Sequence, residues 1–426
     1  MQTLTFATIA AFILLFGLIS KRIQTTIVSA PMIFVLFGLV LSRWGLGMIT
    51  LEENSEAVNV IAELTLILIL FTDASRINLR ELRREHNIPV RLLSFGLPLT
   101  IVAGIVAAMV LLDGINIWEA AVVAVILAPT DAALGQAVVS DRRVPVRIRQ
   151  ALNVESGLND GIALPILLFV LTGADIAESI GSVAYWVQFA ALQLLFGPLV
   201  GVAVGYVGAK STQWAVRSGW MSESYLELSA VAVSLLAYSG AELIGGNGFI
   251  AAFCAGLTLG NVAPNISRRI HDFAEAGGQL LTLVTFLLFG AIMAPSALAD
   301  ATAPIVIYAI VSLTIVRMAP VAISQIGVRL QPGTVGFLGW FGPRGIASIL
   351  YALLLLEHSG IQASDMILTT VFVTVLLSIF AHGMTAVPAA SWYARYVAQR
   401  EEGSEMVEHM TVSEMPVRTR YRVPYG

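Results

Sequence analysis

Charged residues are scarce in this sequence. Asp, Glu, Lys and Arg make up 12% of the 426 residues, whereas hydrophobic residues make up 57%. Soluble domains contain about 25% charged residues, so the composition excludes a soluble globular protein and indicates a chain that crosses a membrane several times. The formal net charge of −4 offers no basic excess of the kind that binds nucleic acid.

Residues that hold metals and cofactors in soluble enzymes are almost absent. The single cysteine, Cys254, excludes a disulfide within the chain and a cluster of cysteine metal ligands. None of the five histidines has the HExxH spacing of a zinc protease, and there is no Walker loop. We therefore expect no enzymatic activity and no cofactor.

A cleavable leader is also not indicated. Residues 1–3 contain no basic residue, and the first positive charges, Lys21 and Arg22, follow the first apolar run. A secretory signal carries its positive charges before the apolar region. We expect this first span to be retained, with the N-terminus outside.

Long apolar runs dominate the rest of the chain. A helix needs about 20 apolar residues to cross a bilayer, and thirteen runs approach or reach this length. They are Leu4–Ser20, Thr25–Leu41, Val58–Ala74, Leu92–Leu112, Ile117–Val139, Gln150–Leu171, Ala184–Ala209, Ser224–Ile244, Gly248–Val262, Ala276–Met293, Ala303–Ser324, Thr334–Leu356 and Met366–Ala386.

The basic residues support this count, because Lys and Arg concentrate in cytoplasmic connections. With thirteen spans, every Lys and Arg outside the spans, except Arg43, falls in a connection after an odd-numbered span or in the tail. Arg317 and Arg344 lie within spans. We expect a protein of the cell (inner) membrane, composed of a transmembrane domain (1–390) and a short, disordered cytoplasmic tail (391–426).

Two of the expected spans are interrupted. The fifth contains Ala-Pro-Thr-Asp at 128–131, and the twelfth contains Gly-Pro-Arg-Gly at 342–345. Proline removes a backbone donor and breaks the helix, and such irregular backbone survives at membrane depth only inside protein or beside a water-filled cavity. The breaks correspond if the first six and last six spans are inverted repeats around the seventh, as in secondary transporters.

The stretch Asn153–Gly161 places four polar side chains inside the sixth span: Glu155, Ser156, Asn159 and Asp160. On a helix, Ser156 and Asp160 share one face, and Glu155 and Asn159 share the adjacent face. An Asp at the centre of a membrane helix costs roughly 2.5–3.5 kcal/mol. Buried acids at this position therefore indicate a functional site.

Asp160 is the candidate site shared by a cation and a proton. A carboxylate is a hard oxygen ligand, and burial raises its pKa so that proton and cation compete near neutral pH. Ser156, on the same face, and Thr130, at the break of the fifth span, can add oxygen ligands. Either hydroxyl alone would more often bond back to its own helix.

Two other acids have two interpretations each. Asp131, at the break, either coordinates the ion or accepts hydrogen bonds from the helix-end amides of the other broken span, and we favour the second. Asp73, near the inner end of the third span, is either a ligand or an ordinary interfacial acid beside Arg76.

A buried arginine needs an acidic partner. We expect Glu155 and Arg344 to form a structural ion pair. No partner for Arg317 can be assigned from the sequence.

These residues resemble the monovalent cation:proton antiporter family, in its NhaP-like sodium/proton exchanger branch. The resemblance covers about residues 4–390. The motifs that carry it are Phe71–Ala74, Pro129–Asp131, Glu155–Asp160 and Gly342–Gly345. It implies that Asp160 exchanges the ion, that Ser156 and Thr130 help to hold it, and that Asn159 tunes the site. It also implies a homodimer in which a core, built around spans 4–6 and 11–13, moves like an elevator.

The leading interpretation is a sodium/proton antiporter. Asn159 beside Asp160 leaves one exchangeable carboxylate, which suits an electroneutral exchange of one proton for one cation. The alternatives are a potassium/proton antiporter of the same fold and, in a different class, a gated cation channel or membrane sensor.

Overall fold

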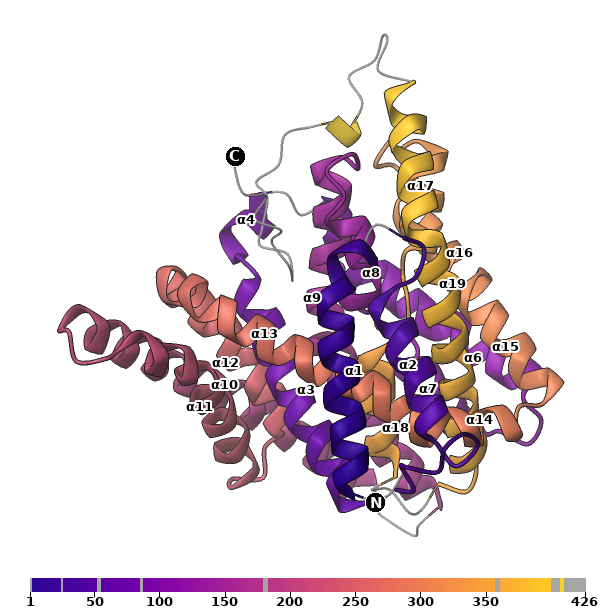
Figure 1. Ribbon diagram of the computed structural model, residues 1–426, viewed down its shortest axis with the longest axis horizontal. Helices are drawn as coiled ribbons and strands as arrows, with labels where there is room; N and C mark the ends of the chain where they lie inside the picture. The colour runs from indigo at the N-terminus through magenta and orange to yellow at the C-terminus, as the bar shows by residue number, and fades with distance from the viewer. Residues whose placement is uncertain are drawn as a thin grey trace.

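The chain folds into a bundle of helices. The computed structural model describes residues 2–23, 26–51, 55–84, 87–178, 183–356, 361–399 and 407–409, and all regular elements in these ranges are helical (Figure 1). Among these residues, eight helices are long and apolar enough to cross a membrane, or nine if the bent pair Gly248–Val262 and Pro264–Ile270 is one span. The protein is therefore an all-helical, polytopic membrane protein.

The helices of the first half lead to the site. They are α1 (Gln2–Ile23), α2 (Ala30–Leu41), α3 (Glu56–Arg76), α4 (Leu79–Arg84), α5 (Asn87–Arg91), the π-helical turn η1 (Leu92–Gly96), α6 (Leu97–Leu111), α7 (Ile117–Ile126), α8 (Ala132–Val139) and α9 (Val146–Glu178).

The second half continues with α10 (Val183–Arg217), α11 (Glu223–Glu242), α12 (Gly248–Val262), α13 (Pro264–Leu288), the π-helical turn η2 (Phe289–Met293), α14 (Ala294–Ala299), α15 (Ala303–Leu313), α16 (Ile315–Ser324), α17 (Pro332–Trp340), α18 (Ile346–Leu355), α19 (Ser364–Ala398) and the 3₁₀ turn η3 (Val407–His409).

Both predicted helix breaks are confirmed. The fifth expected span is divided into α7 and α8, and the twelfth into α17 and α18. A third interruption, not predicted from the sequence, lies at Thr314 between α15 and α16, where φ is −110° and ψ is −89°. The consequence is that Arg317 belongs to a short, separate helix rather than to one continuous span.

Two helices extend beyond the expected spans. Helix α13 begins at Pro264, well before the expected start of the tenth span at Ala276, and α19 continues past Ala390 to Ala398. Part of the tail is also ordered against the bundle, because the Glu408 side chain is buried and accepts a hydrogen bond from the backbone amide of Gln331 (2.8 Å). The rest of the tail lies outside the described residues.

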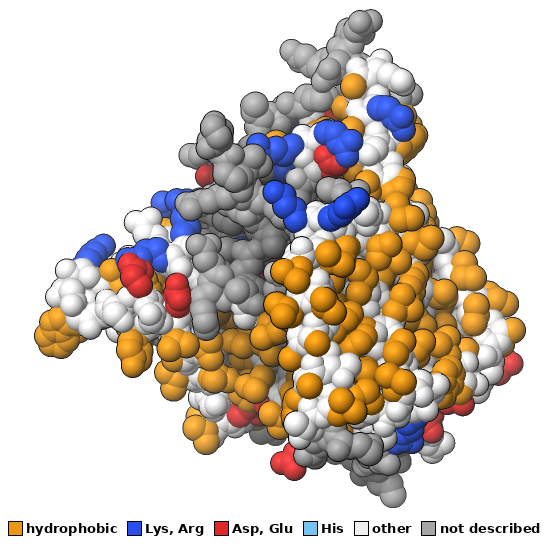
Figure 2. Space-filling view, in the orientation of Figure 1, with side chains coloured by type: hydrophobic (Ala, Val, Ile, Leu, Met, Phe, Trp, Pro, Cys, Tyr) orange, Lys and Arg blue, Asp and Glu red, His pale blue; other side chains and the backbone are white. Residues whose placement is uncertain are grey.

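The visible surface separates apolar and basic side chains. Figure 2 shows hydrophobic side chains over most of the flank formed by α1, α2 and α19, whereas Lys and Arg gather near the upper end. Large exposed side chains on α1, including Leu14 and Leu18, face outwards. This is the surface expected of helices in contact with lipid tails.

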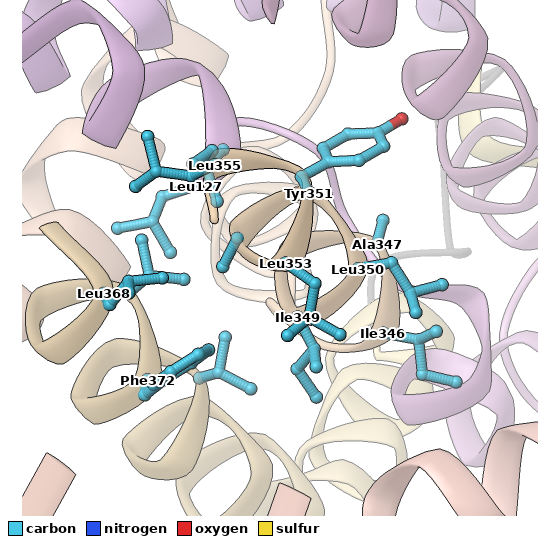
Figure 3. Close-up of a cluster of buried hydrophobic side chains, with 14 of the residues drawn as sticks. Leu127, Ile346, Ala347, Ile349, Leu350, Tyr351, Leu353, Leu355, Leu368 and Phe372 are labelled. Atoms are coloured by element: carbon cyan, nitrogen blue, oxygen red, sulfur yellow. The ribbon is translucent and has the colours of Figure 1, made fainter. Parts of the chain in front are cut away.

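The interior around α18 is entirely apolar on one side. Figure 3 shows Ile349, Leu353 and Leu355 of α18 in a cluster with Leu368 and Phe372 of α19, and all five are buried. The hydroxyl of Tyr351 points away from this cluster. Helix α18 therefore packs one face into the core and turns another towards α9.

Close helix contacts are made where glycine removes the side chain. On α12, Gly256 and Gly260 are one turn apart and lie against the backbone of Phe71 and Ser75 on α3. A Cβ atom at Gly260 would lie 2.8 Å from the carbonyl carbon of Ser75. Small residues at this spacing allow helix backbones to approach in membranes.

We predict that Gly260→Ala lowers the melting temperature of the purified protein, because an added methyl group at a tight contact costs about 1–3 kcal/mol. The matched control is Gly277→Ala in α13, where a Cβ would meet nothing within 4 Å. That variant should be neutral or stabilising, since alanine favours a helix over glycine by about 1 kcal/mol. Equal effects of both substitutions on thermal melts in detergent would contradict the packing argument.

Candidate functional site

The two helix breaks lie against each other inside the bundle. The backbone amide of Asp131, between α7 and α8, donates to the carbonyl of Pro343, between α17 and α18, at 2.8 Å. Four helix ends therefore meet in one buried region. Helix ends carry unsatisfied backbone groups and partial charges, so each end here needs a partner from the protein.

Asp131 serves the two positive helix ends. Its carboxylate accepts hydrogen bonds from the amide of Ala133, at the start of α8 (2.7 Å), and from the amide of Ile346, at the start of α18 (2.8 Å). These are the helix-end contacts that we favoured for Asp131 from the sequence. The side chain is buried, with 6% of its surface exposed. Its carboxylate therefore links the start of α8 to the start of α18.

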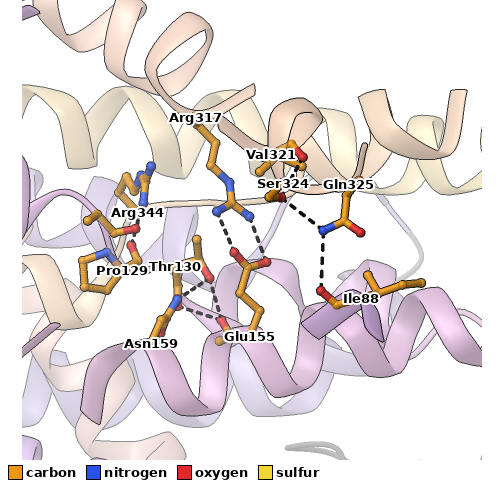
Figure 4. A network of polar contacts seen from close by, with 12 residues as sticks. Ile88, Pro129, Thr130, Glu155, Asn159, Arg317, Val321, Ser324, Gln325 and Arg344 are labelled. Carbon is orange, nitrogen blue, oxygen red and sulfur yellow. Dashed lines mark hydrogen bonds and ion pairs between the residues drawn. The ribbon is translucent and has the colours of Figure 1, made fainter. Parts of the chain in front are cut away.

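Arg344 serves the negative end of α7. Its Nη1 donates to the carbonyls of Ala128 and, at 3.0 Å, of Pro129 (Figure 4). The side chain is completely buried. A guanidinium placed at the carbonyl end of a helix offsets the partial negative charge of that end.

The predicted ion pair between Glu155 and Arg344 is wrong. Glu155 on α9 instead pairs with Arg317 on α16, with contacts of 2.6 Å to Nη1 and 2.8 Å to Nη2, and both side chains are buried (Figure 4). The physical reason is that Arg344 is taken up by the carbonyl end of α7. The break at Thr314 sets off the short helix α16, from which Arg317 meets Glu155.

Two residues of α19 complete the crossing and were missed from the sequence. The hydroxyl of Ser378 accepts from the amide of Arg344 (2.7 Å), and His382 Nε2 lies 2.9 Å from the carbonyl of Trp340, the last residue of α17. His382 Nδ1 lies 3.1 Å from the Ser378 hydroxyl. A histidine inside an apolar span, four residues after a serine, was the available signal.

Three polar side chains predicted to share a site are brought together. Asn159 Nδ2 donates to the hydroxyl of Thr130 (2.7 Å), which lies 3.2 Å from the hydroxyl of Ser156. The Ser156 hydroxyl donates to the carbonyl of Thr130 (2.7 Å). Helix α9 is thus bonded to the break after α7 through side chains of the motif.

Asp160 lies one helical turn after Ser156 and is buried, with 8% of its surface exposed. Its backbone carbonyl accepts a hydrogen bond from the hydroxyl of Tyr351 on α18, at 2.8 Å. Both broken spans therefore reach the Asp160 segment: the fifth through Thr130 and Ser156, and the twelfth through Tyr351.

A small, partly open cavity reaches this region between α8 and α9. Its polar lining includes Asp131, Gln136, Ser140, Asn153 and Ser156. Of these residues, Gln136 and Ser140 lie towards the end of α8 that is followed by the arginine-rich loop, so the cavity extends from the site towards that loop.

That loop carries an exposed ion pair. Burial alone would raise the pKa of Asp141, but the hydrogen bonds from Arg143, at 2.7 Å to Nη2, outweigh burial and lower the pKa of Asp141. The carboxylate therefore stays charged at neutral pH, and the basic loop carries a compensating negative charge next to the cavity.

Asp73 lies apart from this network. It is buried on α3, and its carboxylate is 4.0 Å from Arg76. A Cβ at Gly157 would lie 4.0 Å from the carbonyl of Asp73, so α3 passes close to α9 at this point. Both sequence interpretations of Asp73, as a ligand and as an acid beside Arg76, are compatible with this position.

The donor set suits a hard monovalent cation. It consists of hydroxyl groups, backbone carbonyls and carboxylates, and carboxylate and carbonyl oxygens bind hard cations. Among the described residues, no group of three or more His, Cys, Asp or Glu is placed to hold a metal ion.

Two interrupted helices that meet beside buried acids are the arrangement found in membrane proteins with discontinuous helices, such as secondary transporters. The family model for the transmembrane part of sodium/hydrogen exchangers matches residues 8–392. The chain therefore belongs to the sodium/hydrogen exchanger family.

Individual relatives agree with this assignment. The K(+)/H(+) antiporter NhaP of Alkalimonas amylolytica is 29% identical over 381 residues, covering 88% of this chain and 64% of that protein. The Na(+)/H(+) antiporter ApNhaP of Aphanothece halophytica is 27% identical, covering 82% of this chain and 67% of that protein. The chain thus spans about two thirds of the length of these relatives.

The fold is shared with a solved structure. The sodium proton antiporter MjNhaP1 from Methanocaldococcus jannaschii superposes with a TM-score of 0.73 at 20% identity, covering 90% of this chain and 99% of that chain. The likeness extends over nearly the whole bundle described above.

We predict that Arg317→Met lowers stability by about 3–5 kcal/mol, because it leaves the Glu155 carboxylate buried without its partner. Adding Glu155→Gln should recover part of this loss, and a double-mutant cycle of unfolding free energies measures the coupling. The matched control cycle combines Glu155→Gln with Arg344→Met. A coupling that is larger in the control cycle than in the first would show that Glu155 depends on Arg344 instead.

Proposed function

We propose that the protein is a secondary active antiporter that exchanges a monovalent cation, sodium in the first place, for a proton. The observation that carries the proposal is the position of Asp160. It is a buried acid one turn from Ser156, which is bonded to Thr130 where two helix breaks meet. Acids buried in membrane spans mark ion and proton pathways.

The exchange is a competition at Asp160. A bound proton neutralises the carboxylate, and a bound cation does the same, with the oxygens of Ser156 and Thr130 replacing part of its hydration shell. The other acids nearby have structural partners: Asp131 caps two helices, and Glu155 is held by Arg317. Asn159 is neutral and orients Thr130. Asp73 is a further candidate ligand at the α3 side of the site.

Potassium is the second candidate cation. The relative from Alkalimonas amylolytica is named a K(+)/H(+) antiporter, and the one from Aphanothece halophytica a Na(+)/H(+) antiporter. A gated cation channel or sensor belongs to a different class and needs no titrating acid. Rates that saturate with the cation and depend on the proton gradient distinguish an antiporter from a channel.

The proposal also includes the arrangement of the spans in the membrane. We propose thirteen spans, in which two inverted six-helix repeats surround the seventh, with the N-terminus outside and the tail in the cytoplasm. The segregation of basic residues supports this orientation. Spans 4–6 and 11–13 form the core that carries the site. The core moves like an elevator against the remaining helices, which form the contact of a homodimer in the inner membrane.

We predict that Asp160→Asn folds but performs no exchange, because the substitution keeps the shape and removes the exchangeable charge. The measurement is dye-monitored proton movement in proteoliposomes driven in turn by sodium, lithium and potassium. Asp113→Asn, at an exposed acid in a turn, is the matched control and should transport normally. Cation-driven proton movement by Asp160→Asn would disprove the assignment of the exchanging carboxylate.

We also predict a stoichiometry of one proton for one cation. With a single carboxylate emptied in each cycle, the moving core carries the same charge in both directions. The membrane potential, worth about 2.3 kcal/mol per charge per 100 mV, should then leave the exchange unbiased. The reversal point is measured in opposed gradients while the potential is set by a permeant ion that the protein does not exchange. A reversal point that moves with the potential would rule out a single exchanging carboxylate.

A further inference from the structure

A second cavity lies at the other end of the bundle. It is a partly open pocket lined by residues of α3, α11, α12 and α18. Its lining includes the apolar side chains of Leu350 and Leu354 of α18 and Phe249 of α12. The polar groups of α3 are Asn59 and Glu63, four residues apart and so on one face of the helix.

Glu63 lacks a partner among the described residues: it makes no hydrogen bond or ion pair there. It lies seven residues into α3, which at 1.5 Å per residue is about 10 Å along the helix from its first residue. Its side chain is partly exposed and lines the cavity, so a cation in the cavity can pair with the unpartnered carboxylate.

Asn59 supplies a second, independent signal. Its Oδ1 atom is buried and has no hydrogen-bond donor in the described part of the chain. A buried acceptor without a partner is unfavourable. Carboxylate and amide oxygens one turn apart are ligands of the hard type that alkali cations take.

Two of the helices that line the cavity, α18 and α12, also contact the Asp160 segment. Leu350 lines the cavity, and the next residue, Tyr351, bonds the carbonyl of Asp160. On α12, Phe249 lines the cavity, and one turn later the ring of Phe253 fills the space beside Gly161, where a Cβ would lie 2.6 Å from its Cδ2 atom.

The two cavities approach this region from opposite ends. The first extends along α8 towards the arginine-rich loop, whereas the second lies near the start of α3, far from the arginines that follow the end of α3. These two cavities thus lie towards opposite ends of the bundle.

From this geometry we propose that Asn59 and Glu63 form a capture site for a monovalent cation at the face opposite the arginine-rich loops. The proposal rests on the proposed antiport function and adds a site to it. The carboxylate of Glu63 raises the local cation concentration, and Asn59 supplies a neutral ligand. The ion passes to Asp160 when the contact of Phe253 and Tyr351 with the α9 segment opens.

The test is exchange in proteoliposomes of determined orientation, with sodium or potassium supplied at one face at a time. Glu63→Gln should raise the apparent KM for the cation at the cavity face roughly threefold to tenfold, as expected for the loss of one charge several ångströms from the ion. The KM at the opposite face and the maximal rate should not change. Glu63→Asp should restore most of the affinity, and added choline chloride should reduce the difference by screening.

The matched control is Glu56→Gln, an exposed acid at the start of the same helix that does not line the cavity. It should leave the KM at both faces unchanged. A KM for Glu63→Gln that is unaltered, or altered equally at both faces, would overturn the capture site while exchange by the wild type still supports the antiporter.

A second measurement does not depend on transport. In a Cys254→Ala background, Leu354→Cys is labelled with a membrane-impermeant maleimide in sodium, potassium or choline at equal ionic strength. Sodium or potassium should slow the labelling, and Glu63→Gln should abolish the slowing. Slowing that persists in Glu63→Gln, or does not occur at all, refutes the site. Slowed labelling of Leu354→Cys, together with no exchange by the wild type in proteoliposomes, refutes the proposed function instead.

Discussion

The structure depends on one constraint, which is that four helix ends meet where water is scarce. An unpaired backbone amide or carbonyl in such a place costs several kcal/mol, so a broken helix is stable only with a partner for each end. Asp131 accepts from the starts of α8 and α18, Arg344 donates to the end of α7, and His382 contacts the end of α17. These partners explain most of the buried polar residues around the site.

The same constraint assigns different tasks to the acids near Asp160. Asp131 cannot leave its amides without exposing two helix starts, and Glu155 cannot move away from Arg317 without separating a buried ion pair. Both acids are therefore engaged in holding the fold together. The proposed exchange then falls on Asp160, whose α9 segment is positioned by Tyr351 and, through Ser156, by Thr130.

The parts that could be predicted from the sequence are those with local causes. Proline beside polar residues or glycine disfavours the continuation of a helix, so the breaks near Pro129 and Pro343 were predictable, as was the helix-end role of Asp131. Pro165, which has apolar neighbours, lies inside helix α9 instead. The helical spacing of Ser156 and Asp160 likewise depends only on the local chain.

The partner of Glu155 could not be predicted in the same way. Arg317 and Arg344 are both buried arginines, and the choice between them depends on how α16 packs after the break at Thr314. Nothing proline- or glycine-like marks that break, since Thr314 is an ordinary residue in an apolar run. The contact of His382 with Trp340 could not be predicted from the sequence either, because it depends on how α19 packs against the end of α17.

The site motif also shapes the surface along which the proposed core would move. Within Asn153–Gly161, glycines occupy the positions at which α9 meets the neighbouring helices: Gly157 lies close to α3, and Gly161 lies against Phe253 of α12. Each glycine directly follows a polar site residue, Ser156 or Asp160. Because glycine has no side chain, α9 can shift at these contacts without first separating interlocked side chains. The glycines thus let the polar groups lie close to α3 and α12 without locking the core to them, which is what a site exposed alternately to two cavities requires.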